Sequence, residues 1–149
     1  MAIPTGSVPG RRAPLRNERL ASDYLRRAGS RVLAIEVLVK EQSWADVVRE
    51  SQEVVEIVLK ALLRTMNIEV PQIHDVSPIL LENRERLPAA AGIALDELVG
   101  ASRSLRRDRE LAFYGSEDLT PSEFYQRDDA ERALAMARRV LEVVKSAVS

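Results

Sequence analysis

The sequence predicts an all-α protein, an antiparallel up-and-down bundle of four long helices and one short helix. Apolar residues recur at steps of three and four along most of the chain, which is the spacing of one helix face. No segment alternates apolar and polar residues for long enough to form a strand. The breaks between the periodic stretches are short, as they are in up-and-down bundles.

Length and composition set the broad class of the protein. A chain of 149 residues fits one domain, and we expect residues 1–15, which are rich in Pro and Gly, to form a flexible arm before a helical domain at 16–149. There is no cysteine, which excludes disulfides and thiolate metal sites and agrees with a cytoplasmic location. No apolar run is long enough to span a membrane. The net charge of -1 gives no overall attraction to nucleic acid.

The first two long helices follow from their stripes and their end signals. The periodic pattern of the first begins at Asn17. Ser43 is a typical N-cap, so the second helix is expected to begin at Trp44 and to be closed by Asn67. The buried stripe of the first helix is expected to be Leu20, Tyr24, Ala28, Val32, Ile35 and Val39.

Two further helices are expected in the middle of the chain. Ser77 followed by proline resembles an N-cap with Pro at the first helical position, which opens a short helix ending near Arg86. The fourth helix should then cover residues 90–113, with Gly115 as its stop signal.

The last helix is expected at residues 128–148 and has the cleanest apolar stripe of the chain. An ordered loop at 119–127 precedes it. Four aromatic residues bracket this loop, and either they fasten it to the bundle or they stack on a nucleic-acid base. They are Phe113, Tyr114, Phe124 and Tyr125.

The fourth helix carries the most informative charges. Its stripe of Leu95, Leu98, Ser102 and Leu105 continues to Arg109, which would therefore point into the bundle or into an interface and needs an acceptor there. Arg103, Arg106 and Arg107 complete a basic cluster on an otherwise neutral chain. One interpretation is a contact to phosphate or to an RNA backbone. The other is a structural ion pair for Arg109, with the remaining arginines solvated.

Other titratable residues also have two interpretations each. His74 precedes Asp75, which could hold its ring in one tautomer for base catalysis, although a hydrogen-bonded loop histidine is the commoner use. Glu53 and Glu56 lie one turn apart and could serve acid–base chemistry, a metal, or ion pairs with arginine. With one histidine and no cysteine, we expect no metal and no cofactor.

Several separated segments, spread over residues 20–144, resemble HEPN-domain proteins. They are SQEVVEIVLKALL at 51–63, Pro71, His74 with Asp75, RELAFYG at 109–115 and PSEFY at 121–125. The resemblance implies an up-and-down helical bundle that commonly forms homodimers. It also implies one of two uses. Many family members resemble toxin-type ribonucleases encoded beside a minimal nucleotidyltransferase antitoxin, and others are non-catalytic binders of nucleotides or proteins.

The sequence departs from the ribonuclease pattern at its key residue. Active members carry Arg-x4–6-His on the helix that corresponds to the fourth helix here. From Arg107 the histidine would fall at 112–114, and from Arg109 at 114–116, but none of these residues is histidine. Tyr114 is the nearest substitute, and a phenol with a pKa of about 10 is a poor base at neutral pH.

Our leading hypothesis is therefore a homodimeric, non-catalytic HEPN-type module that binds a nucleotide or another phosphate, or that partners a nucleotidyltransferase in a system of the toxin–antitoxin kind. Its site would comprise Arg103, Arg106, Arg107, Arg109 and Tyr114. One alternative is a metal-independent ribonuclease in which Tyr114 or His74 replaces the missing histidine. Another is a subunit that only binds a partner protein.

Overall fold

The computed structural model describes the backbone of residues 9–70, 75–115 and 119–149, and the side chains of 16–70, 75–106, 115 and 119–149. The described chain is helical and contains no strand, as expected. Four helices have 20 residues or more: α1 (Pro9–Lys40), α2 (Trp44–Thr65), α5 (Leu95–Tyr114) and α7 (Arg127–Val148). The short elements are α3 (Ser77–Glu82), a 3-10 turn (Arg84–Arg86), α4 (Ala89–Ile93) and α6 (Pro121–Phe124).

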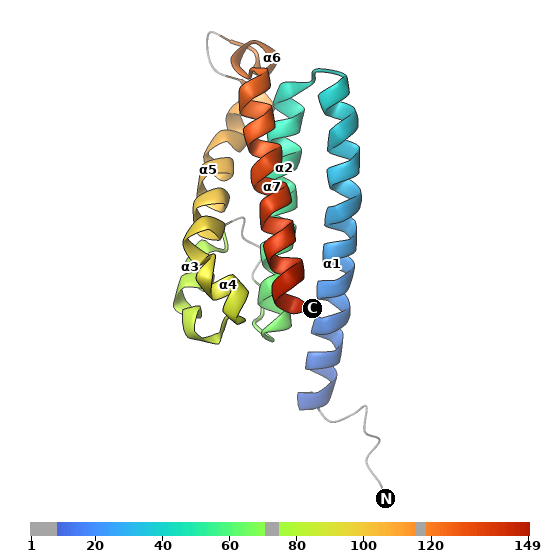
Figure 1. The fold of residues 1–149 in the computed structure, drawn as a ribbon, viewed down its shortest axis with the longest axis vertical. Helices are drawn as coiled ribbons and strands as arrows, with labels where there is room; N and C mark the ends of the chain where they lie inside the picture. Colours follow the sequence, from blue (N-terminus) through green and yellow to red (C-terminus); the bar gives the residue numbers. More distant parts are fainter. Residues whose placement is uncertain (1–8, 71–74, 116–118) are drawn as a thin grey trace, which may run out of the picture.

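The four long helices lie side by side along the long axis of the molecule (Figure 1). α3 and α4 lie toward one end of the bundle and α6 lies at the other (Figure 1). α2 packs against α1, α5 and α7, so it is the central helix. The sequence reflects this position, because α2 is buried over far more of its circumference than one stripe. Its fully buried side chains include Val47, Val54, Val58, Leu59 and Leu62.

Two predicted stop signals are confirmed by the backbone. Asn67 has a φ of 57°, and the amide of Ile68 reaches back to the carbonyl of Leu63 at 3.1 Å, which closes the end of α2. Gly115 has a φ of 82° directly after α5. A Cβ there would lie 2.6 Å from the carbonyl oxygen of Leu119, so glycine is required for both conformation and space.

The predicted N-caps are confirmed only in part. Ser43 occupies the N-cap position of α2, but its hydroxyl donates to Asp46 Oδ2 at 2.6 Å instead of capping a backbone amide. At α3 the prediction is wrong by one residue, since Val76 is the N-cap and Ser77 is the first helical residue. The cap is supplied from further back, because Asp75 Oδ1 accepts from the Ser77 amide at 3.1 Å.

Three helix boundaries also differ from the prediction. The fourth predicted helix is divided at Ala94, which ends α4 and gives way to α5. The expected loop after Leu119 contains α6, whose start is fixed by a capping box between Thr120 and Glu123. α1 begins at Pro9, eight residues before the periodic pattern, because a helix that projects beyond its bundle needs no apolar stripe there. Proline is well suited to a first turn.

A polar contact fastens α1 to the end of α2. Asn17 is only 8% exposed, its amide nitrogen donates to Asn67 Oδ1 at 3.2 Å, and its own Oδ1 accepts from Arg64 at 3.1 Å. The sequence offers no local signal for this contact, because the two asparagines are 50 residues apart.

Candidate functional site

α5 carries the arginine cluster, and its described part has the predicted orientation. Arg103 and Arg106 are exposed, while the side chains of the stripe are buried. Each residue of the stripe is no more than 4% exposed: Leu95, Leu98, Ser102 and Leu105. The helix therefore presents guanidinium groups to solvent while its opposite face is buried in the core, an arrangement that suits phosphate binding.

Arg106 has a partner that the sequence did not indicate. Its Nη1 lies 3.1 Å from Asp75 Oδ2, and the two side chains are 47% and 27% exposed. The other carboxylate oxygen of Asp75 accepts from the Ser77 amide. One carboxylate thus ties the start of α3 to the middle of α5.

The surroundings of Asp75 stabilise its charged form. Burial by itself raises the pKa of this carboxyl, but the hydrogen bond from the Ser77 amide and the charges of Arg106 and Arg103 outweigh burial. The pKa of Asp75 is consequently below its usual value of 3.8. Both carboxylate oxygens contact these groups, so Asp75 connects the start of α3 to α5. The contact with His74 that the sequence suggested lies outside the described residues.

The remaining predicted site residues lie outside the described part of the structure. Arg107, Arg109 and Tyr114 belong to α5, but their side chains are not described, and His74 lies in the undescribed connection between α2 and α3. Of the six predicted residues, the structure places Arg103 and Arg106 together beside Asp75.

Glu53 and Glu56 of α2 line one groove, and Glu56 forms an ion pair. Glu56 is 7% exposed and pairs with Lys60 at 3.0 Å, and Glu53 lines the same shallow groove against Tyr24 and Arg31 of α1. Among the described residues, no group of three or more His, Cys, Asp or Glu side chains could hold a metal ion.

The aromatic residues near α6 divide into structural and exposed members. Tyr125 is 3% exposed and belongs to the hydrophobic core, so it fastens this loop to the bundle, and its ring packs edge-on against Phe124 with ring centroids 5.0 Å apart. The side chains of Phe113 and Tyr114 lie outside the described residues. Phe124 is 40% exposed. Trp44 lies under the guanidinium of Arg127 at 5.1 Å, a cation–π contact that joins the starts of α2 and α7.

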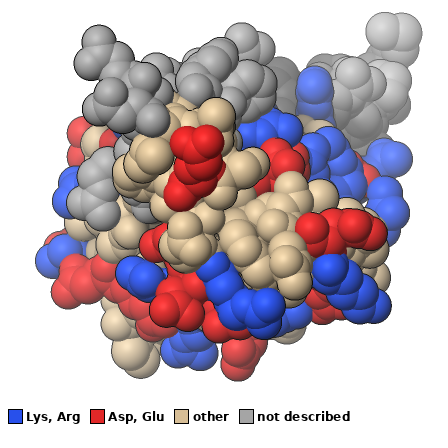
Figure 2. Space-filling view, turned by 90° about the horizontal axis from the view of Figure 1, so that it is seen from above, with Lys and Arg blue, Asp and Glu red and all other residues tan. Residues whose placement is uncertain are grey.

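Charges of both signs are mixed over the end of the bundle that carries α6. Figure 2 shows acidic and basic side chains interleaved over the described part of this surface, with apolar and neutral residues between them. Recognition of an anion here would rest on local arginines, since no broad positive field is visible on this face.

Within the described ranges, no helix is both long and apolar enough to cross a membrane.

Comparison with known proteins agrees with the helical bundle. The family model for the HEPN domain matches residues 21–147, which is most of the chain. No curated protein and no solved structure matches it. The matched range begins within α1, ends in the last turn of α7 and includes the Asp75–Arg106 contact. The chain therefore belongs to the HEPN domain family.

Proposed function

We propose that this HEPN domain is a non-catalytic binding module that holds a phosphate-bearing ligand, a nucleotide or an RNA backbone, against the arginines of α5. The observation that carries this proposal is the exposure of Arg103 and Arg106 on a helix whose opposite face is buried. Guanidinium groups donate several charge-assisted hydrogen bonds in a planar arrangement that matches phosphate.

The spacing of the arginines supports one binding face. Arg103, Arg106 and Arg107 are related by three and four residues within one continuous helix, so they start from the same side of α5. Arg109 comes one turn after the buried Leu105 and would approach the ligand from the edge of the bundle. Asp75 neutralises part of this positive charge when no ligand is bound.

The missing histidine favours binding over cleavage. The single histidine of the chain, His74, precedes α3, and α5 contains none. The residue that performs proton transfer in ribonucleases of this family is therefore absent from the helix that should carry it. Tyr114 is the nearest titratable side chain in that helix, and its ordinary pKa is far above neutral.

Titration calorimetry with ATP, AMP and a short single-stranded RNA at two salt concentrations tests the proposal. We expect Arg103→Gln and Arg107→Gln to weaken binding and to reduce its salt dependence, because each removes one phosphate contact. Asp75→Asn should strengthen binding, because it releases Arg106 from its ion pair. The matched control is Arg132→Gln, an arginine with a 64% exposed side chain on α7.

Three outcomes would overturn the proposal. These are no binding of any ligand, equal losses in Arg132→Gln and Arg103→Gln, or weaker binding in Asp75→Asn. RNA cleavage by the unmodified protein that is lost in the Tyr114→Phe, His74→Ala double variant would establish the ribonuclease alternative instead.

The proposal includes two partners, a second copy of the chain and a nucleotidyltransferase. The family relationship supports both, because many HEPN domains pair in one of these ways. Light scattering on the purified protein tests the homodimer, and co-purification with a nucleotidyltransferase from the same genome tests the second partner. A monomer that binds phosphate ligands normally would remove the dimer from the proposal and retain the binding site.

A further inference from the structure

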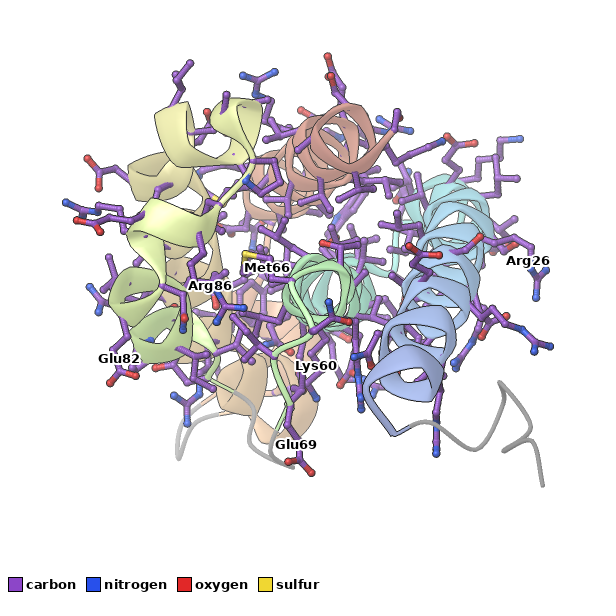
Figure 3. The ribbon with its side chains drawn as sticks, turned by 90° about the horizontal axis from the view of Figure 1, so that it is seen from below. Arg26, Lys60, Met66, Glu69, Glu82 and Arg86 are labelled. Atoms are coloured by element: carbon purple, nitrogen blue, oxygen red, sulfur yellow. The ribbon has the colours of Figure 1, made fainter. Side chains whose placement is uncertain are left out.

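A cavity lies at the opposite end of the bundle from α6 (Figure 1). Its walls come from α1, from the last residues of α2 and α7, and from the segment around Arg86 and Pro88. Its volume is about 760 Å³, within the range of roughly 300–1,000 Å³ that is usual for small-molecule sites. Figure 3 shows this end of the bundle, with Met66 and Arg86 close together beside α2.

Much of the cavity wall is apolar and is held by the core. Ala21 of α1 is 2% exposed and Met66 at the end of α2 is 9% exposed. Leu25, Pro88 and Val148 extend this surface from three separate elements. An apolar wall contributed by several anchored elements keeps its shape without a ligand, and it favours a ligand with a hydrocarbon body.

Arg86 supplies a fixed cation to this wall. One of its terminal nitrogens donates to the carbonyl of Met66 at 2.8 Å, and the other donates to Asn83 Oδ1 at 3.2 Å. The bond to Met66 stabilises the carbonyl end of α2, where positive charge is favourable. The two bonds use two of the five N–H donors of a guanidinium, so three remain for a bound anion.

The cavity wall carries charged groups of both signs. Lys145 lines the cavity from the last turn of α7 and makes no ion pair among the described residues. Glu18 is the carboxylate on the opposite wall. Arg26 contributes its aliphatic stem, because its guanidinium pairs with Asp23 and points away from Arg86 and Met66 (Figure 3). Arg86 and Lys145 are therefore cations of this wall that form no ion pair with a carboxylate among the described residues.

We propose that this cavity binds a small amphiphilic anion, with its hydrocarbon body against Leu25, Met66 and Val148 and its carboxylate or phosphate head against Arg86 and Lys145. The site is separate from the arginines of α5 and does not depend on their function. It requires a ligand with both parts, because the wall offers apolar area and two cations within one opening.

Calorimetry with ligands that share one tail tests this proposal. The probes are octanoate, octyl phosphate, octanol and octylamine, each titrated into the full chain. We expect the two anions to bind and the alcohol and amine to bind at least about fivefold more weakly, since only the anions gain charge-assisted hydrogen bonds. A preference between octanoate and octyl phosphate identifies the natural head group.

Substitutions locate the binding. Lys145→Met and Arg86→Met keep most of the side-chain volume and should each weaken the anions about fivefold to tenfold, without changing octanol. Ser22→Trp places a large ring at the cavity wall from an exposed position and should weaken all binding. Arg84→Met, an exposed neighbour that does not line the cavity, is the control.

Three results would contradict the proposed ligand site. Octanol that binds as tightly as octanoate would mean that the charges of Arg86 and Lys145 do not contribute to ligand binding. Anion binding that survives both Lys145→Met and Ser22→Trp would place the ligand elsewhere, and absence of any binding would remove the site. Thermal unfolding shows whether each variant is folded. The side chains of Lys145 and Ser22 form no hydrogen bond or ion pair among the described residues, so their variants remain informative if Arg86→Met destabilises the fold.

Discussion

Replacing Asp75 separates two contributions that one carboxylate makes to stability. Asp75→Asn keeps an oxygen that can accept from the Ser77 amide and removes the charge that faces Arg106. Asp75→Ala removes both interactions. The two variants therefore differ by the hydrogen bond at the start of α3, and Asn differs from the original protein by the ion pair.

The exposure of these side chains sets the expected loss in the free energy of unfolding for each variant. The Arg106 side chain is 47% exposed, so its ion pair should contribute about 0.5–1 kcal/mol to the free energy of unfolding. A side-chain bond to a first-turn amide typically contributes about 1 kcal/mol. Asp75→Asn should thus cost about 0.5–1 kcal/mol and Asp75→Ala about 1.5–2 kcal/mol. For a chain of this length, each kcal/mol lowers Tm by about 2–4 °C.

Urea unfolding followed by circular dichroism measures both losses, and the pH dependence provides a second test. Because the pKa of Asp75 is lowered in the folded protein, its contribution is complete above the unfolded value near 3.8 and is lost as the pH falls through the lower folded value. The difference between the original protein and Asp75→Asn should therefore be constant from about pH 7 to about pH 5 and should shrink below about pH 4.

Two results would refute this reasoning. One is an equal loss in Asp75→Asn and Asp75→Ala, which would mean that the bond to Ser77 contributes nothing. The other is additivity of Asp75→Asn with Arg106→Gln, since a real ion pair requires coupling between them. Asp23→Asn is the control, because its pairs with Arg26 and Arg27 are exposed and lie within one helix, and it should cost less than about 0.5 kcal/mol.

Two further predictions concern single side chains. Gln52 is 1% exposed and its Oε1 has no hydrogen-bond partner among the described residues. Gln52→Met should therefore raise the free energy of unfolding by about 1 kcal/mol in urea titrations. A loss of stability would show that the amide is needed. Gly115→Ala should lower Tm by at least about 3 °C in thermal scans, because of its φ of 82° and the 2.6 Å approach to Leu119, and a value unchanged from the original protein would contradict the strained geometry.

Some features of the candidate site were predictable from the sequence pattern and others were not. The stripe that ends at Leu105 and the outward position of Arg103 and Arg106 were predictable, because both follow from the repeat of one helix. The ion pair between Arg106 and Asp75 was not, since 31 positions separate them and nothing local brings them together. Asp75 was noticed only as a neighbour of His74 along the chain.

The features of the fold also separate into those that the local sequence determines and those that depend on packing. The sequence by itself determined that the chain is helical and where α2 and α5 end, because Asn67 and Gly115 act through their own backbone conformations. Tertiary structure decided the rest. The ion pair between Asp75 and Arg106 and the burial of Asn17 against Asn67 both depend on residues far apart in the chain. Helix periodicity is a property of neighbouring residues, whereas these features depend on which helices pack together, and packing is settled only when the whole bundle forms.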